Sequence, residues 1–508
     1  MLSPVLQVGA CVMIILGIVG LVSLVMKRLC LTEDASRQII HVLVALLVSI
    51  APYILRDMGS LLVLALIFTM LNMIALTTNG VQAMHGVRRL SFGTVFFPIS
   101  YGILVILFFN RSPSILTMSM LVLGLGDVAA AWVGTRVPST KFRVFSDVKS
   151  SAGCYAMFIV SSLVLFICLL TLPSLPPLSL LSALSLSLLT GVVATSLECA
   201  SYRGTDNLTI PLGTGVFLDF ALTSPATPIV SLCLWTLLTL VVVVVFVRKG
   251  SLSRSGGIAA FWMGVVVFPL GRAWFGPVLA FFVPSSLLSK VKGRGGRADV
   301  KEKAEKKAVK GSRRDCVQVF ANGGCAIACA CIYHFHPSVP VYCAFVTSLA
   351  ASSADTWASE IGTLSKGLPR MLLTLRQVER GVSGAVSGLG TLACAMGALV
   401  VSVTGVYGMA HLSGLSDTVP YPSTSPLALL GVFTVCGVVG CMVDSILGAS
   451  VQRVGVCREC KAETEALTHC NRLTDTVKGW QYMDNDAVNA CASCLGGVAG
   501  ALAIGMMR

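Results

Sequence analysis

The chain has 508 residues, of which 55% are hydrophobic and only 12% are charged, and its mean hydropathy is +0.85. A soluble globular protein carries about 25% charged residues, so this composition excludes that class. Mostly apolar runs of about 18 or more residues recur along the sequence, and each is long enough to cross a bilayer as a helix. The sequence therefore predicts an all-α, polytopic membrane protein with roughly 14–16 transmembrane or re-entrant helices.

The first apolar run starts almost at the N-terminus, and no Arg- and Ser-rich presequence precedes it. We therefore expect an integral membrane protein of the endoplasmic reticulum, with a plastid membrane as the alternative. The apolar runs divide into two modules, and we expect their boundary between residues 247 and 248, giving modules 1–247 and 248–508.

The net charge of +14 is concentrated in a basic loop, residues 290–314. In a soluble chain such a block would suggest nucleic acid. In a membrane protein it is typical of a cytosolic loop, so we expect a lipid bilayer and no nucleic acid as its surroundings. The loop is also suited to anionic phosphates or lipid headgroups. The oligomeric state stays open.

Polar residues stand at the ends of apolar spans throughout the first module. In chain order they are Arg37, His41, Ser91–Pro98, Asp127, Lys149, Ser150, Glu198, Asp206 and Asn207. Carboxylates such as Asp127, Glu198 and Asp206 are ligands that Mg²⁺ accepts, usually while it bridges phosphates. Lys149 and Ser150 can bind phosphate oxygens, and Asp127 or Asp206 can serve as a base for an alcohol. This inventory predicts a site for phosphoryl transfer.

The second module carries its main polar signal in Ser352–Gly362, which reads S-S-A-D-T-W-A-S-E-I-G. An ionised carboxylate in a bilayer is costly and usually faces a polar cavity with a function, so Asp355 and Glu360 are candidate site residues. Both modules contain Asp followed by Ala three and Gly seven residues later, beginning at Asp127 and Asp355. This short repeat indicates two distantly related modules. The simpler alternative is that these acids are paired inside a helical bundle for packing, and that His41 lies near a headgroup.

A polar loop at residues 454–484 contains Cys457, Cys460, His469 and Cys470. Two short pairs of Cys and His fit tetrahedral Zn²⁺, so this loop is a candidate zinc-ribbon-like element with a structural metal. Free thiols in a reducing loop are the alternative.

The first module resembles the CTP-dependent polyprenol kinases, which act on phytol, farnesol or dolichol. The likeness rests on the motifs at Arg37–His41, Ser91–Pro98, Asp127, Lys149 and Asp206–Pro211. Val128, Ala152 and Cys154 replace Gly, Glu and Ser of that family's pattern. The resemblance implies Mg²⁺ on Asp127 and Asp206, with Glu198 in support. It also implies that CTP is the phosphate donor, held by Lys149 and Ser150, and that Arg37, His41 and Asn207 contact the substrate or nucleotide.

The second module resembles the family that contains plant phytyl-phosphate kinase and its uncharacterised transmembrane relatives. The motifs lie near Lys290, Asn322, Asp355, Arg370, Asp444 and Asp484. The resemblance implies catalytic roles for Asp355, Glu360, Asp444 and Asp484, and Mg²⁺ on Asp355 and Asp444. Substrate or nucleotide contacts fall on Lys290, Arg370, Asn485 and Asn489.

These two resemblances imply a fused enzyme that phosphorylates an isoprenoid alcohol (phytol, geranylgeraniol or farnesol) to the monophosphate and then to the diphosphate. Three alternatives remain. A membrane cytidylyltransferase would share the Gly-Asp and Lys-loop pattern and release pyrophosphate rather than CDP. A transporter of lipids or isoprenoids also uses intramembrane charges and broken helices. In the transporter alternative, the second module has no catalytic activity. In the third alternative, the first module is the only kinase and the second module is its non-catalytic partner.

Overall fold

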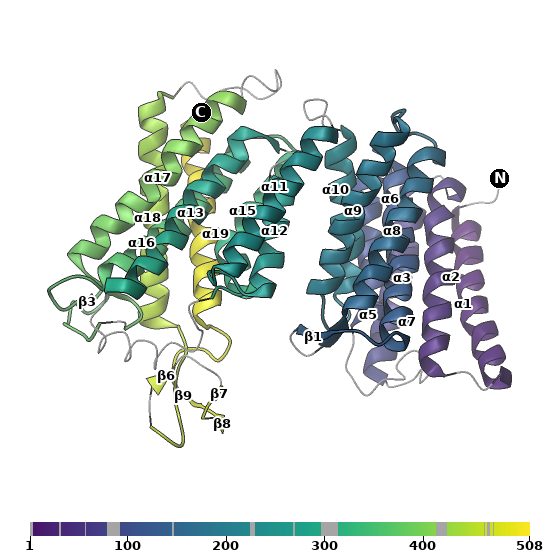
Figure 1. Ribbon diagram of the computed structural model, residues 1–508, viewed down its shortest axis with the longest axis horizontal. Helices are drawn as coiled ribbons and strands as arrows, with labels where there is room; N and C mark the ends of the chain where they lie inside the picture. Colours follow the sequence, from purple (N-terminus) through teal and green to yellow (C-terminus); the bar gives the residue numbers. More distant parts are fainter. Residues whose placement is uncertain are drawn as a thin grey trace. The chain divides into compact units, whose positions relative to one another are not determined.

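A computed structural model describes residues 4–29, 32–55, 57–78, 92–144, 147–223, 229–267, 270–295, 313–380, 382–412, 424–461, 463–464, 468–470 and 472–507. The chain folds into two compact units, Met1–Leu234 and Trp235–Arg508, which are drawn in Figure 1. This division lies 13 residues before the boundary expected after residue 247 (247 − 234). Most of the basic loop, including the Lys290 side chain, lies outside the described residues.

The first unit is helical apart from one hairpin. Its elements are α1 (Pro4–Leu29), α2 (Glu33–Ile54), α3 (Met58–Thr78), α5 (Gly93–Phe108), α6 (Pro113–Leu121), the π-helix η1 (Val122–Asp127), α7 (Val128–Arg136), β1 (Lys141–Val144), β2 (Asp147–Ser150), α8 (Ser151–Thr171), α9 (Leu180–Ala200) and α10 (Asp206–Thr223). The segments α6, η1 and α7 form one continuous rod, Pro113–Arg136. This rod contacts α2, α8 and α10, so it lies inside the unit.

The second unit contains a longer set of helices and a small β region. Its elements are α11 (Ile229–Arg248), α12 (Arg254–Val267), α13 (Arg272–Gly295), α15 (Cys316–Phe335), α16 (Val339–Gly362), β3 (Arg370–Met371), β4 (Ala385–Val386), α17 (Gly388–Leu412), α18 (Pro426–Ser450), β5 (Val454–Val456), β6 (Glu463–Thr464), β7 (Thr468–His469), β8 (Arg472–Leu473), β9 (Asp475–Lys478) and α19 (Asn485–Met506). The boundary precedes most of α11 because this helix packs on the second unit. The ring of Trp235 lies 5.2 Å from that of Phe275, and the ring of Phe246 lies 4.8 Å from that of Phe282.

Helix α16 is the central helix of the second unit and contacts α13, α15, α17, α18 and α19. Its residues Ala350–Ala354 are all buried. A Cβ atom added at Gly440 on α18 or Gly496 on α19 would lie 2.5 or 2.8 Å from the Cβ of Ala351. Small residues therefore let the three backbones approach closely, which is a common way for membrane helices to associate.

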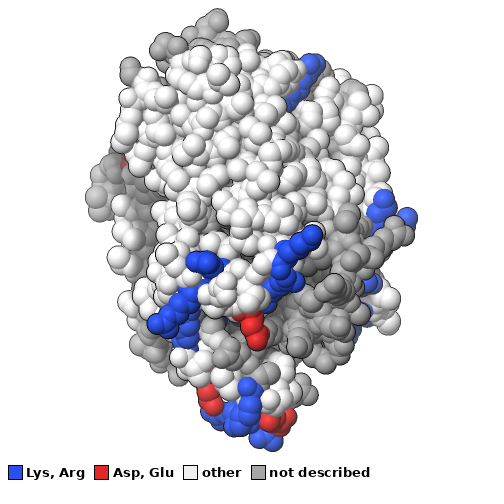
Figure 2. All heavy atoms as spheres, turned by 90° about the vertical axis from the view of Figure 1, so that its left-hand side faces the viewer, with Lys and Arg blue, Asp and Glu red and all other residues white. Residues whose placement is uncertain are grey.

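In the part of the chain that the structure describes, eleven helices are long and apolar enough to cross a membrane, and three shorter apolar helices accompany them. Helices α10 and α16 fall outside both groups, although each is largely buried. They are the helices that carry Asp206, Asp355 and Glu360. The expected all-α, polytopic class is confirmed. Figure 2 shows a broad face with almost no charged side chains, and most of the visible Lys, Arg, Asp and Glu side chains gather below it.

The strands form short antiparallel pairs at polar loops. Strand β1 pairs with β2, β3 with β4, and β7 with β8, while a three-stranded sheet has the order β6-β5-β9. The last two groups make up the cysteine-containing loop. The loop between α16 and α17 carries exposed Lys366, Arg370, Arg376 and Arg380, so one end of the second unit is basic.

Candidate functional site

A large cavity opens within the first unit and has a volume of about 1200 Å³. Small-molecule sites usually measure about 300–1,000 Å³, so this one has room for more than one ligand. One part is lined by charged residues of α2, η1, β2, α9 and α10, and another by apolar residues of α1, α3 and α5 such as Ile15, Leu64 and Phe68. The cavity is therefore amphipathic and fits a polar ligand beside an apolar chain.

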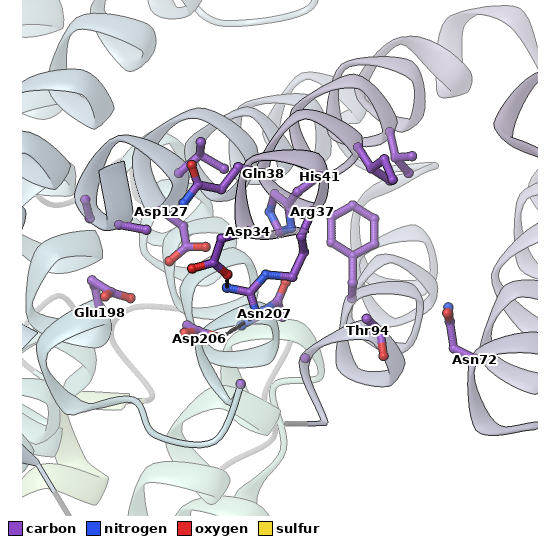
Figure 3. A pocket seen from close by; sticks show the side chains of 18 of the residues that line it. Asp34, Arg37, Gln38, His41, Asn72, Thr94, Asp127, Glu198, Asp206 and Asn207 are labelled. Atoms are coloured by element: carbon purple, nitrogen blue, oxygen red, sulfur yellow. Dashed lines mark hydrogen bonds and ion pairs between the residues drawn. The ribbon is translucent and has the colours of Figure 1, made fainter. Parts of the chain in front are cut away.

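Three carboxylates meet in the charged part of the cavity. Asp127, Glu198 and Asp206 each offer an oxygen, and these oxygens all lie within 4.8 Å of one another. Figure 3 shows the three side chains facing a shared space. They come from different places in the fold: the end of η1, the end of α9 and the start of α10. The first-module acids proposed from the sequence are thus brought together.

The π-helix η1 places Asp127. Such single-turn π segments occur mostly within α-helices and frequently at functional sites. Here η1 contains Gly124, where an added Cβ would lie 2.3 Å from the Cβ of Ala45 on α2. The ring of His41, also on α2, hydrogen-bonds to the backbone of Leu123 in η1. The helix that carries Asp127 is therefore held against α2 by close packing and by one histidine.

Lys149 lies directly against the carboxylates. It sits on β2, and its Nζ is 2.5 Å from Oε1 of Glu198 and 4.0 Å from Oδ2 of Asp206. Burial alone would lower the pKa of Lys149, but the carboxylates of Glu198 and Asp206 outweigh it and hold that pKa above the ordinary lysine value. The β1–β2 hairpin thus delivers a permanent positive charge to the acid group. The other carboxylate oxygen of Glu198, Oε2, is buried and has no hydrogen-bond partner among the described residues.

Ser150 and Asn207 stabilise the neighbouring helix starts. The Ser150 hydroxyl accepts a hydrogen bond from the Gly153 backbone at 3.2 Å and caps α8. Asn207 donates to Oδ1 of Asp206 from both its backbone and its side-chain nitrogen, each at 2.8 Å. Arg37 lines the cavity and pairs with Asp34 at 3.3 Å. The first-module site residues that we proposed therefore line one cavity, together with part of the stretch Ser91–Pro98, whose Ser91 lies outside the described residues.

His41 lies in the cavity wall beside α5. Its ring packs edge-on against Phe97, with 5.3 Å between ring centroids. Its Nε2 is buried and has no hydrogen-bond partner among the described residues. An unpartnered buried nitrogen beside a cavity is a candidate ligand contact.

The cavity also contains polar residues that the sequence reasoning missed. They include Asp34, Asn72, Thr94, Tyr101 and Arg203. Thr94 and Tyr101 have buried hydroxyl oxygens without a hydrogen-bond partner among the described residues. Thr94 lies inside the motif Ser91–Pro98, so the sequence indicated this segment but did not single out Thr94. The others stand in segments with no pattern of their own.

The second unit places its candidate acids differently. Asp355 and Glu360 lie on α16, and both act electrostatically on Arg314. Asp355 and Asp444 both act on Cys441 of α18. Among the residues that the structure describes, however, no three of the proposed acids bring ligand oxygens as close together as the first-unit acids do. A compact three- or four-carboxylate metal centre is therefore not formed here.

The remaining second-unit candidates lie at helix ends and in the basic end of the unit. Asp484 is the N-cap of α19, where its Oδ1 accepts a hydrogen bond from Ala487 at 2.9 Å. Asn485 and Asn489 follow in the first turns of that helix. Arg370 lies on β3 and is exposed. Arg314 was missed as a site residue because it ends the basic run assigned to a cytosolic loop.

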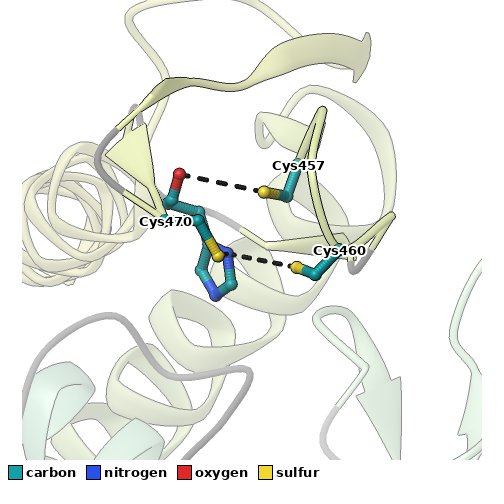
Figure 4. A group of neighbouring side chains, drawn as sticks. Cys457, Cys460 and Cys470 are labelled. Carbon is teal, nitrogen blue, oxygen red and sulfur yellow. Dashed lines mark hydrogen bonds between the residues drawn. The ribbon is translucent and has the colours of Figure 1, made fainter.

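The cysteine-containing loop forms a compact group of metal-type ligands. The ligand atoms of Cys457, Cys460, His469 and Cys470 all lie within 4.8 Å of one another, and Figure 4 shows the three thiols turned toward the same point. Nδ1 of His469 lies 3.4 Å from Sγ of Cys460 and 3.3 Å from Sγ of Cys470. For Zn–S of about 2.3 Å and Zn–N of about 2.0 Å, a tetrahedral site requires about 3.5 Å between such atoms. The spacing fits one Zn²⁺.

The backbone of this loop is shaped around the same four residues. Cys457 follows β5, and His469 and Cys470 lie in the β7–β8 hairpin. Cys470 and Lys461 have φ angles of +50° and +58°, which non-glycine residues rarely adopt. Hydrogen bonds from the Cys460 backbone and from His469 lower the pKa of Cys457 to about 6. The thiolate that a metal needs is thus favoured at Cys457.

Comparison with known proteins places the second unit in a family. A family profile described as "Integral membrane protein DUF92" matches residues 237–497. The chain belongs to this family. The match starts within α11, close to the structural boundary at Trp235.

Several characterised and uncharacterised proteins are similar to this DUF92 member. Protein PGR of Arabidopsis thaliana is 29% identical over 257 residues, which cover 48% of this chain and 85% of PGR. A phytol kinase of Synechocystis sp. is 30% identical over 204 residues, which cover 40% of this chain and 85% of that kinase. Protein VTE6, chloroplastic, of A. thaliana is 27% identical over 251 residues, which cover 49% of this chain and 63% of VTE6. No solved structure matches the chain. The likeness to a phytol kinase supports a kinase-type transferase family.

Proposed function

We propose that this DUF92 protein is a bifunctional membrane kinase that converts an isoprenoid alcohol to its monophosphate and then to its diphosphate, with CTP as phosphate donor. The observation that carries the proposal is the cavity of the first unit, where a lysine and three carboxylates meet apolar walls. Phosphoryl transfer needs positioning and charge neutralisation above all. A prenol needs an apolar channel for its chain. The named phytol kinase relative supports the same class of reaction.

The first unit would carry out the first step. Lys149, with the start of helix α8 at Ser150, would bind phosphate oxygens, because a cation and a helix N-terminus both favour anions. Asp127 would accept the proton of the alcohol, and Asn207 would orient Asp206. The unpartnered Oε2 of Glu198 and the nearby oxygens of Asp127 and Asp206 fit a Mg²⁺ ligand set. Mg²⁺, when bound, would neutralise phosphate charge.

The second unit would phosphorylate the monophosphate. Asp355 and Glu360 on α16 are its central acids, with Asp444 on α18 in support. The fusion itself has a chemical reason: a product with one apolar tail can pass between two sites while remaining in the membrane. A second unit without catalytic activity is the alternative.

We also propose that Cys457, Cys460, His469 and Cys470 hold one structural Zn²⁺. The donor set is complete at four ligands, so no open position remains for catalysis. The protein would be an integral membrane protein of the endoplasmic reticulum or, as the name of the VTE6 relative suggests for that protein, of a plastid.

Product analysis tests the two-step reaction. Membranes that contain the chain receive CTP, Mg²⁺ and geranylgeraniol, beside Asp127→Ala and Asp355→Ala variants. We expect diphosphate from the parent, monophosphate from Asp355→Ala and neither from Asp127→Ala. Monophosphate from every active form would limit the protein to the first step. Labelled CTP separates the classes: a kinase releases CDP, a cytidylyltransferase releases pyrophosphate, and a transporter consumes none.

A further inference from the structure

A second, smaller cavity lies within the second unit among α11, α12, α13 and α15, with a volume of about 240 Å³. Its walls are apolar and aromatic, and include Trp235, Phe275 and Phe282. The Thr239 hydroxyl in its wall is bonded to the Trp235 carbonyl at 2.8 Å. The other polar side chains in the lining are Arg314, Gln318 and Asn322. The cavity is therefore an apolar slot with one polar end.

Arg314 is held firmly at that end. Its backbone N–H donates to Ser251 at 3.0 Å, and its carbonyl accepts from Ser253 at 2.9 Å. An added Cβ at Gly256 would lie only 2.1 Å from the Arg314 carbonyl oxygen, so helix α12 packs tightly against this backbone. The guanidinium is thus carried on a fixed piece of chain rather than on the outer part of the basic loop.

The polar end of the slot adjoins the acids of α16. The backbone oxygen of Asn322 accepts a hydrogen bond from Ser352 at 2.7 Å, one turn before Asp355. Glu360 and Asp355 both act electrostatically on Arg314. Arg314 therefore lines the polar end of an apolar slot and interacts electrostatically with two carboxylates that the proposed second step uses.

We propose that Arg314 binds the phosphate head of a prenyl monophosphate whose isoprenoid chain enters the slot between α11 and α13. This inference rests on the proposed function. An arginine fork matches the oxygens of a phosphate in geometry and charge. A dianionic phosphate beside Asp355 and Glu360 would otherwise be repelled. Leu238 of α11 and Leu279 of α13 line the slot and are also exposed, so an isoprenoid chain can reach the slot from the lipid.

Binding to the full-length protein tests this site. Photolabelling with a benzophenone-bearing geranylgeranyl monophosphate is measured for the parent, Arg314→Gln and Arg313→Gln, with unlabelled prenyl monophosphate as competitor. Arg313 is the adjacent, exposed arginine and serves as control. We expect about 10- to 100-fold weaker labelling for Arg314→Gln, since hydrogen bonds to charged groups contribute about 1.5–3 kcal/mol. Arg313→Gln should label like the parent.

The slot is tested separately from the arginine. Ala260→Phe fills it, whereas Ala410→Phe makes the same change at an exposed position of α17 outside the slot. We expect loss of labelling for Ala260→Phe alone. In the parent, the label should lie on peptides of α11 or α13. Both variants should be extracted by detergent in equal yield. Equal labelling of Arg314→Gln and the parent, or label outside these helices, would overturn the site while leaving diphosphate formation intact. Inorganic phosphate serves as a second competitor. If it does not reduce labelling of a parent protein that makes diphosphate, the ligand of the site is the prenyl phosphate and not free phosphate. Parent protein that neither labels nor makes diphosphate would overturn the second step together with this site.

Discussion

Nζ of Lys149 on β2 lies 2.5 Å from Oε1 of Glu198 on α9, and the two residues are 49 positions apart in the chain. This buried pair either stabilises packing or prepares a phosphate site. Breaking a buried pair from one side costs about 3–5 kcal/mol, whereas replacing both partners is often nearly neutral. Lys149→Gln alone should therefore lose both stability and activity.

The double variant Lys149→Gln/Glu198→Gln separates the two roles. It should recover most of the thermal stability lost by Lys149→Gln, yet keep an activity about 10²–10³-fold below the parent, the usual cost of losing one electrostatic contact to the transition state. Exposed Arg136, outside the cavity, gives the control Arg136→Gln. Melting temperature in detergent and CDP release are the measurements. Full recovery of activity in the double variant would make the pair purely structural.

Two aspartates of the first unit should respond to substitution in opposite ways. Asp219 on α10 is fully buried and accepts a hydrogen bond from Arg111 at 3.0 Å. Asp219→Asn should lower the free energy of unfolding by about 3 kcal/mol or more, while the folded fraction keeps its turnover. Asp127→Asn should keep the fold and lose turnover. The measurement for both variants is the activity per folded molecule, taken from the monodisperse fraction. An equal loss of turnover in the two variants would contradict the different roles of Asp127 and Asp219.

The packing of η1 against α2 gives a third prediction. Gly124→Ala places a Cβ 2.3 Å from Ala45, and overpacking of this kind typically costs about 1–3 kcal/mol. Because Asp127 ends the same π segment, turnover should fall as well. Gly17→Ala on α1 is the matched control, since nothing lies within 4 Å of its added Cβ. Unchanged stability and turnover in Gly124→Ala would show that this contact relaxes freely.

The sequence was sufficient for the class of fold and for the first group of acids. Apolar runs fix the helices, because backbone groups in a bilayer must be satisfied within each segment. Asp127, Glu198 and Asp206 were expected together, and they meet because each stands at a helix end on the same side of the unit. The Cys and His residues of the loop were expected as one group for a similar reason: their spacing is short.

Other features depend on contacts that no local pattern encodes. The structural boundary between the units lies before the expected one because Trp235 and Phe246 pack on α13. A hydropathy pattern contains no information on such contacts. The acids of the second unit share a motif order with the first, yet among the described residues no three of them form a comparably close group. Arg314 ends a basic run in the sequence, and only the structure shows that it lines the slot of the second unit. Long-range packing thus decides which polar residues form a site.

Metal removal tests the cysteine group. The purified chain should contain about one Zn²⁺ per molecule by elemental analysis, and Cys457→Ser or a strong chelator should release it. Because metal binding contributes folding free energy to such small elements, the released form should be cut by protease within residues 454–484. Cys436→Ser, in helix α18, is the control and should keep its zinc. Zinc-free parent protein with an intact loop would contradict the assignment.

A pair of thiols beside the first site provides the last test. Sγ of Cys154 on α8 lies 3.1 Å from Sγ of Cys199 on α9, so a small movement would bring them to the 2.05 Å of a disulfide. A diazenedicarboxamide oxidant should take up two protons and two electrons from this pair and become the hydrazine. Peptide mapping should then find the Cys154–Cys199 bond. CDP release should fall, because Cys199 adjoins Glu198 and Cys154 lines the cavity, and a reducing agent should restore it. Cys154→Ser should resist the oxidant; a parent chain that forms no such bond would show that α8 and α9 are farther apart in the membrane.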